Sequence, residues 1–128
     1  MNLLLDTHIF IWLSTNSQQL LPAWQQTLQD SSNQLMLSVV SLWEMQIKVQ
    51  IGRLVLPMPA NRLLVAQQAL NNIQVIPIFP HHIWELDNLP LHHKDPFDRL
   101  LMAQAIAEKL QLVSMDSVFS QYPVQLYR

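Results

Sequence analysis

The 128-residue sequence contains no cysteine and one glycine, Gly52. The absence of cysteine excludes a disulfide framework, a thiolate metal site and a cysteine nucleophile. A single glycine excludes the glycine-rich loops that cradle phosphates in Walker-type and dinucleotide-binding proteins. No apolar run approaches the roughly 18 residues needed to cross a bilayer, so we expect a protein without a membrane segment.

Charged residues are also scarce, at 12% of the sequence, and the formal net charge is −2. This balance does not by itself indicate nucleic-acid binding. Half of the residues are hydrophobic, so we expect residues 1–128 to form a single domain with a full core. The segment from Met1 to Asp6 has no basic region and reaches an acid at once. This favours a buried strand over a signal peptide, and a cytoplasmic location.

Short apolar runs alternate with segments of helical periodicity along the chain. The expected strands are residues 2–5, 35–40, 74–79 and 112–115, with a last edge strand at 123–127. Pro77 should make the third strand an edge strand or an interrupted one. The expected helices are residues 9–13, 18 to about 29, 41 to about 51, 60–70, 80–87 and 96 to about 109. This alternation predicts an α/β fold, a three-layer α/β/α sandwich around a central parallel sheet of four to five strands.

One helix start is rich in carboxylates. Asp95 occupies the N-cap position, Pro96 the first helical position and Asp98 the first turn. The helix is followed by a short apolar run that ends at Asp116. In an α/β unit the start of a helix and the end of the next strand lie at the same edge of the sheet, where ligands bind. We therefore expect Asp98 and Asp116 to be neighbours in space.

Two more acids are expected at this edge. Asp6 ends the first strand, and Glu44 lies in the first turn of a helix that Ser41 opens with a capping box. Carboxylates that converge in a crevice cannot all stay ionised without a cation. Oxygen ligands without histidine or cysteine suit Mg²⁺ or Mn²⁺, as two metals about 4 Å apart or as one metal with a protein base. Such sites perform phosphoryl chemistry, so the candidate metal-binding and catalytic residues are Asp6, Glu44, Asp98 and Asp116.

Each acid also has a purely structural alternative. Glu44 could complete its capping box, Asp98 could favour the helix dipole, and Asp116 could start a turn. Asp6 is harder to explain, because an uncompensated acid at the end of a buried strand is costly. We interpret Asp95 mainly as a helix cap, with an additional acid of the site as the alternative.

Other residues in these segments have less specific patterns. The pair His92 and His93 suggests zinc, but adjacent side chains diverge and no third ligand has zinc spacing. Trp43, Met45 and Met102 are expected in the core.

The cations nearest to the acids in sequence are Arg99 and Lys94. We expect one of them to bind a substrate phosphate, whereas the alternative for Arg99 is an ion pair with a neighbouring acid. Lys48 is less available, because it follows Glu44 by four residues and can pair with it.

Three stretches together resemble a known family. They are LLLDTH at residues 3–8, SVVSLWE at 38–44 and DPFDRLLMAQA at 95–105, which continues to SMD at 114–116. The ordered set resembles the PIN-domain nucleases over nearly the whole length, and within that family it is similar to the bacterial VapC-type toxins. The resemblance implies a Mg²⁺-dependent endoribonuclease that acts on single-stranded regions of RNA, forms a homodimer and is held inactive by a cognate antitoxin protein.

The resemblance also assigns roles to individual residues. The four candidate acids fall on the acidic quartet of the family. Ser114 falls on its small hydroxyl position near the last acid and is a candidate substrate-binding residue. The subgroup also carries an acid where Asp95 stands, so both interpretations of Asp95 stay open.

Rival folds and functions make different demands on the sequence. A phosphoacceptor receiver domain needs an acid at the end of its third strand, where this chain has Ile78, Phe79 and Pro80. A haloacid-dehalogenase-like phosphatase needs an aspartate where this chain has His8. A catalytically inactive PIN-like module that binds RNA or protein remains an alternative, and a metal-binding titration separates it from a nuclease.

Overall fold

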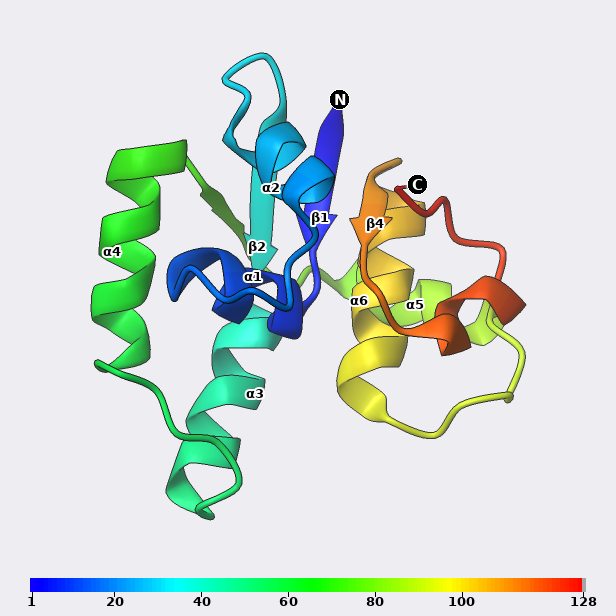
Figure 1. Cartoon of the computed structure of the whole chain (residues 1–128). Helices are drawn as coiled ribbons and strands as arrows, with labels where there is room; N and C mark the ends of the chain where they lie inside the picture. Colours follow the sequence, from blue (N-terminus) through cyan, green and yellow to red (C-terminus); the bar gives the residue numbers. More distant parts are fainter. Residues whose placement is uncertain (128) are drawn as a thin grey trace.

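The computed structural model describes residues 1–127 and contains a four-stranded parallel sheet (Figure 1). The strands are β1 (Asn2–Leu5), β2 (Gln34–Ser38), β3 (Gln74–Ile76) and β4 (Gln111–Val113), in the spatial order β3-β2-β1-β4. Both neighbours of β1 run parallel to it, as does β3 to β2. The predicted parallel sheet is therefore confirmed, with the first strand in its interior.

Helices cover both faces of this sheet, which confirms the three-layer prediction (Figure 1). Leu3 and Leu5 of β1 belong to one core cluster, while Leu4 faces the other, as the twofold alternation of a strand requires. The first cluster also takes residues from α1, α2, α3 and α4, and the second takes residues mainly from α6. The helices are α1 (Thr7–Ser14), α2 (Pro22–Gln29), α3 (Val39–Gln50), α4 (Ala60–Asn71), α5 (Pro80–Glu85) and α6 (Pro96–Ala107), with 3-10 turns η1 (Leu86–Asn88) and η2 (Ser117–Gln121).

Several predicted boundaries are wrong for identifiable reasons. Helix α2 begins at Pro22 rather than at residue 18, because a proline suits the first helical position. Strand β3 ends before Pro77, which has no N–H for the ladder, and its edge position is confirmed. The predicted last strand is reduced to one parallel bridge between Leu112 and Leu126. Within residues 1–127, no helix has both the length and the apolar character that crossing a bilayer demands.

The predicted capping box of Ser41 and Glu44 is also wrong. Helix α3 begins at Val39, and its N-cap is Ser38, whose hydroxyl accepts a hydrogen bond from the N–H of Val40. Ser38 still pairs with Ile76 in the sheet, so strand β2 passes into helix α3 without a loop. Glu44 consequently lies one turn further into the helix than expected, on its buried face.

Candidate functional site

Asp6 joins the end of strand β1 to the start of helix α1. Its N–H donates to the carbonyl of Val113 at 3.0 Å, and its Oδ1 accepts the N–H of Ile9 at 2.8 Å, which caps α1. The side chain is buried, and this burial raises the pKa of Asp6 above its usual value, although Ser114 and the Ile9 N–H act in the opposite direction. The strand-ending acid is therefore a helix cap that is costly to ionise.

Glu44 is the most enclosed of the four candidate acids, with 3% of its surface exposed. Its Oε1 accepts a hydrogen bond from the hydroxyl of Thr7 at 2.6 Å, and its Oε2 pairs with Lys48 Nζ at 2.5 Å. The Thr7 hydroxyl also lies 3.0 Å from Ser41 Oγ. The expected pairing of Lys48 with Glu44 is confirmed. Thr7 was not among the predicted site residues, although its hydroxyl directly follows Asp6 in the sequence.

At the start of helix α6, Asp95 and Asp98 have different surroundings. Oδ1 of Asp95 accepts the N–H groups of Phe97 at 2.9 Å and Asp98 at 3.3 Å, so its interpretation as the N-cap is confirmed. Asp98 instead places Oδ2 2.9 Å from Nε2 of His93. The pKa of Asp98 is raised to about 6, mainly by burial and also by the charges of Asp95 and Glu44, while the contact with His93 acts in the opposite direction.

The cap geometry leads to a first prediction, for Asp95. Asp95→Ala should lower the free energy of unfolding by about 1 kcal/mol, because two N–H groups of the first turn lose their acceptor. Asp95→Asn and Asp95→Ser should recover most of this loss, since both keep an accepting oxygen. Urea unfolding of the three variants measures the effect. Equal losses in all three would show that the charge of Asp95, and not its cap, stabilises the fold.

Asp116 lies at the solvent-facing end of the site. It is exposed, and its Oδ1 accepts the N–H of Val118 at 3.0 Å, which caps η2. Its own N–H donates to Ser114 Oγ at 3.1 Å, and Ser114 is buried. Asp116 and Asp6 line a cavity of about 240 Å³ together with His8, Trp12 and Met115. Ser114 thus interacts with both acids, with the side chain of Asp6 and with the backbone N–H of Asp116.

Pairwise observations link the four acids at the carboxyl edge of the sheet. Asp116 shares a cavity with Asp6, and the charge of Glu44 raises the pKa of both Asp6 and Asp98. The acid and histidine ligand atoms that lie within 4.8 Å of one another at this edge belong to His93, Asp95 and Asp98. The expected proximity of Asp98 and Asp116 stays a prediction. His93 was set aside with the zinc hypothesis, although Asp98 five residues later was a usable signal for the contact.

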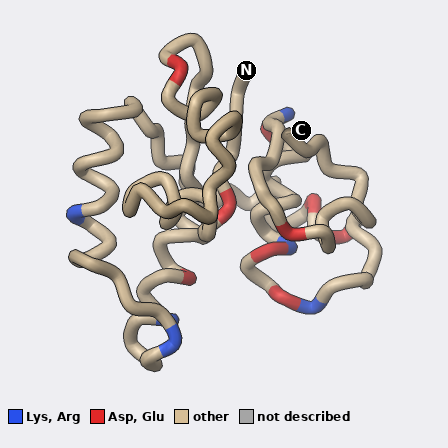
Figure 2. Tube along the Cα trace, in the orientation of Figure 1, with Lys and Arg blue, Asp and Glu red and all other residues tan. Residues whose placement is uncertain are grey.

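The two cations predicted near the acids differ in their contacts. Arg99 Nη1 donates to the carbonyl of Pro90 at 2.8 Å and to that of His93 at 3.5 Å, so this guanidinium fixes the segment before α6. Its contacts are with backbone carbonyls and not with an acid, contrary to the alternative considered above. Lys94 is exposed in the same segment. Figure 2 shows that the lysines and arginines of the described residues 1–127 lie on several separate segments of the trace.

The predicted burial of Trp43 in the core is wrong. The side chain is 57% exposed instead of belonging to the core, whereas Met45 and Met102 are fully buried as expected. Helix α3 buries Val40, Ser41, Glu44 and Met45, and the position of Trp43 lies about 100° around the axis from Glu44. The polar Ser41 and Glu44 thus occupy the face that hydrophobicity alone would have given to Trp43.

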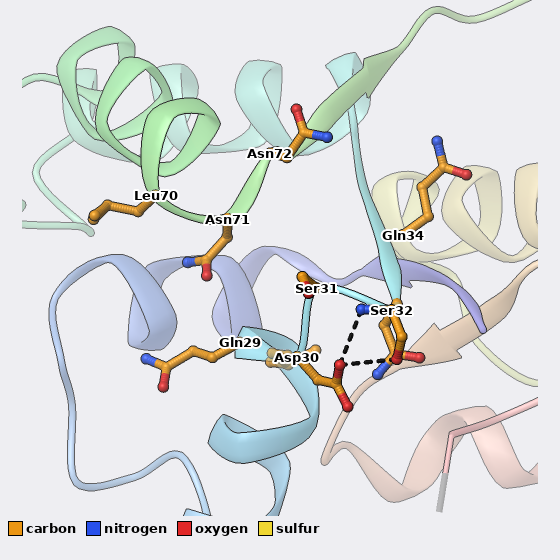
Figure 3. A pocket seen from close by; sticks show the side chains of 10 residues that line it. Gln29, Asp30, Ser31, Ser32, Gln34, Leu70, Asn71 and Asn72 are labelled. Atoms are coloured by element: carbon orange, nitrogen blue, oxygen red, sulfur yellow. Dashed lines mark hydrogen bonds between the residues drawn. The ribbon is translucent and has the colours of Figure 1, made fainter.

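A second cavity, of about 330 Å³, lies at the opposite edge of the sheet, between the loop before β2 and the end of α4 (Figure 3). Its one charged lining residue, Asp30, accepts hydrogen bonds from the N–H and hydroxyl of Ser32 at 2.9 and 2.8 Å. These bonds lower the pKa of Asp30 and hold the loop. The remaining lining residues are amides, serines and leucines, which offer no general base, so the candidate site is the acid edge.

Comparisons with known proteins agree with this fold. The PIN domain family model matches residues 3–125. The fold is similar to that of VapBC2 from Rickettsia felis bound to a promoter DNA fragment, with 18% identity, TM-score 0.75 and coverage of 100% of this chain and 98% of the other. It is also similar to DNA-bound VapBC from Salmonella typhimurium, with 15% identity, TM-score 0.71 and coverage of 100% of this chain and 97% of the other. A third similar structure is FitAcB from Neisseria gonorrhoeae, with 17% identity, TM-score 0.68 and coverage of 98% of this chain and 96% of the other. No curated protein matches the sequence. With its matching family model, its parallel sheet and its acids at the carboxyl edge, this chain belongs to the PIN-domain family.

Proposed function

We propose that this protein is a metal-dependent endoribonuclease that cleaves single-stranded regions of RNA as the toxin of a toxin–antitoxin pair. The observation that carries the proposal is the set of four carboxylates at one sheet edge, of which Asp6 and Glu44 are buried, Asp98 is half-buried and Asp116 is exposed. Burial raises the pKa of two of them, Asp6 and Asp98. Membership of the PIN-domain family and the similarity to VapBC structures support it. The proposal includes a single domain over residues 1–128, a homodimer, a cognate antitoxin protein and a cytoplasmic location.

The donor set of the acid edge fits Mg²⁺ or Mn²⁺. The acids offer carboxylate oxygens, which these cations prefer. A bound cation would favour the ionised form of Asp98, whose pKa is raised mainly by burial and also by the charges of Asp95 and Glu44. Asp6, Asp98 and Asp116 would hold the cation, while Glu44 shares its oxygens with Thr7 and Lys48. The chemistry that the cation supplies when bound is activation of water and stabilisation of charge on the leaving oxygen.

The protein side chains then have separate tasks. Thr7 and Lys48 fix both oxygens of Glu44, so this carboxylate presents its charge to the site in one orientation. His93 holds one oxygen of Asp98 and leaves the other for the cation. Ser114 bonds the backbone at Asp116 and is the candidate hydroxyl for a substrate contact.

A cleavage assay tests the proposed function. Purified protein should cleave single-stranded RNA with Mg²⁺ or Mn²⁺ and should stop when a chelator is added. Induced alone in bacteria, it should arrest growth, and co-expression of a small partner encoded beside it should restore growth. Cleavage that continues in excess chelator would contradict the metal-dependent mechanism. Metal binding without cleavage would favour the alternative, a catalytically inactive PIN-like module that binds RNA or protein.

Lys94 gives a prediction about substrate binding. Because Arg99 is engaged by backbone carbonyls, we expect the exposed Lys94 to be the phosphate contact of this segment. Lys94→Gln should reduce the slope of log affinity against log salt by about 0.7, the value for one contact to a single strand. Lys109→Gln is the charge-matched control, since Lys109 follows α6 at its opposite end. An unchanged slope in Lys94→Gln would remove Lys94 from the contacts.

A further inference from the structure

Two aromatic residues directly precede two of the candidate acids. Trp43 comes before Glu44 on helix α3, and Phe97 comes before Asp98 on helix α6. Helices α3 and α6 are in contact, and the charge of Glu44 affects Asp98, so the two acids face a common space. Consecutive helical residues point about 100° apart. The aromatic pair therefore lies beside the acids and not among them.

The two rings form a fixed unit. Their centroids are 5.1 Å apart with an interplanar angle of 78°, the edge-to-face arrangement that aromatic pairs prefer. Phe97 is half-buried and packs against the second core cluster, while Trp43 is 57% exposed. Phe97 thus holds the indole in place and leaves more than half of Trp43 open to solvent at the border of the acid edge.

From this placement we propose that Trp43, held by Phe97, is the stacking platform for one nucleobase of the single-stranded RNA. The proposal rests on the ribonuclease function proposed above and specifies one contact by which the protein binds its RNA substrate. Bases in a single strand expose their faces, and aromatic side chains bind such faces with little dependence on sequence. A base on Trp43 would place its neighbouring phosphate near Glu44 and Asp98.

The charge of the chain makes such a platform useful. The sequence contains seven lysines and arginines and nine aspartates and glutamates, so acidic residues are in excess. At the acid edge, Lys48 is paired with Glu44, and Arg99 bonds the carbonyl of Pro90. Phosphate contacts can therefore supply little of the affinity that many ribonucleic-acid-binding proteins take from them. Stacking is a source of affinity that does not depend on net charge.

Steady-state kinetics of a tryptophan series tests the proposal. Trp43→Ala should raise KM for single-stranded RNA between about 5-fold and about 160-fold, the range expected for one stacked base, with kcat changed less than about 2-fold. Trp43→Phe should keep most of the affinity. The control is Trp84→Ala, because Trp84 is 67% exposed on helix α5. Helix α5 contacts Glu108 at the far end of α6 through His81 and His82, and the control should leave KM unchanged.

An abasic scan identifies the stacked base. Binding is measured in an Asp6→Asn background with Mg²⁺, so that the RNA stays intact, using oligonucleotides that each lack one base. At one position the missing base should cost the same affinity as Trp43→Ala, and combining the two changes should add nothing, because both remove the same contact. If Trp43→Ala and every abasic position are additive, no base stacks on Trp43 and the proposal is overturned.

The outcomes separate this proposal from the proposed function. A wild-type protein that cleaves no RNA contradicts the ribonuclease function, and absence of RNA binding in the scan then overturns the platform as well. A wild-type protein that cleaves, with KM values equal in Trp43→Ala and Trp84→Ala, overturns the platform alone. Analytical ultracentrifugation of Trp43→Ala and the wild type then tests whether Trp43 lies in a protein interface. A change in oligomeric state would assign Trp43 to a protein interface and also overturn the proposal.

Discussion

Asp98→Asn should stabilise the metal-free protein at pH 7.5 and abolish its stabilisation by Mg²⁺. Asp98 has a pKa of about 6 in the folded protein against a usual 3.8, because it is buried near other acids. That difference corresponds to at most about 3 kcal/mol, and since the side chain is 21% exposed, solvent screening reduces it. We therefore expect a gain of about 1–2 kcal/mol for the neutral asparagine.

The sign of the pH dependence follows from this raised pKa. Between pH 3.8 and about 6 the folded protein binds the Asp98 proton more tightly than the unfolded chain does. Stability of the metal-free wild type should therefore fall as pH rises through this window. The difference in free energy of unfolding between Asp98→Asn and the wild type should reach its maximum above pH 6 and should vanish below pH 3.8.

Urea unfolding with chelator or with Mg²⁺ measures both effects. A cation that binds only the folded state adds about 2.7 kcal/mol at one hundred times its Kd, and the wild type should show this gain. Asp98→Asn should show no such gain in the free energy of unfolding when Mg²⁺ is added. Asp95→Asn is the matched control, because it keeps the cap of the same helix and should keep the Mg²⁺ effect. If Asp95→Asn abolishes the gain and Asp98→Asn retains it, the wrong aspartate has been assigned to the metal.

Asp6→Asn should lower the rate of RNA cleavage by at least about 100-fold. Loss of a residue that merely supports a metal ligand costs 10–100-fold in affinity or activity, and loss of a ligand should exceed that range. Asparagine keeps an oxygen for the N–H of Ile9, so the cap of helix α1 survives and the fold should remain intact.

Initial cleavage rates at saturating Mg²⁺ measure this effect, together with growth after induction in bacteria. The control is Asp87→Asn, which changes an exposed acid on η1 by the same chemistry. The wild type and the control should both cleave RNA and arrest growth, while Asp6→Asn should do neither. Near-normal cleavage by Asp6→Asn would place the active site away from the end of strand β1.

The features that could be predicted from the sequence are those that short segments determine. Asp95, Pro96 and the periodic residues after them define the start of helix α6 in any surroundings. The alternation of apolar strands with helices likewise indicated the parallel sheet, and with it the edge at which Asp6 lies. These features require no knowledge of which distant residues meet.

The features that could not be predicted depend on contacts between distant segments. The start of helix α3 is set by the pairing of Ser38 with Ile76, and a local capping rule does not contain this information. The bond between Thr7 and Glu44 joins residues 37 positions apart. The exposure of Trp43 follows from the burial of Glu44 on the adjoining face of the same helix, a polar residue that hydrophobic patterning assigns to the surface.

The direct passage from strand β2 into helix α3 at Ser38, and the single residue Asp6 between β1 and α1, decide which parts of the site can adapt. Neither junction has loop residues to flex, so their amide hydrogens should exchange with solvent only when the core opens. The segment from Leu89 to Lys94 has no regular structure, and Arg99 bonds its backbone at Pro90 and His93, so the residues between these two points are held by neither a helix nor the sheet. Adjustment to substrates of different shape therefore falls to this segment, on the nanosecond-to-microsecond timescale of loops, against a rigid acid edge.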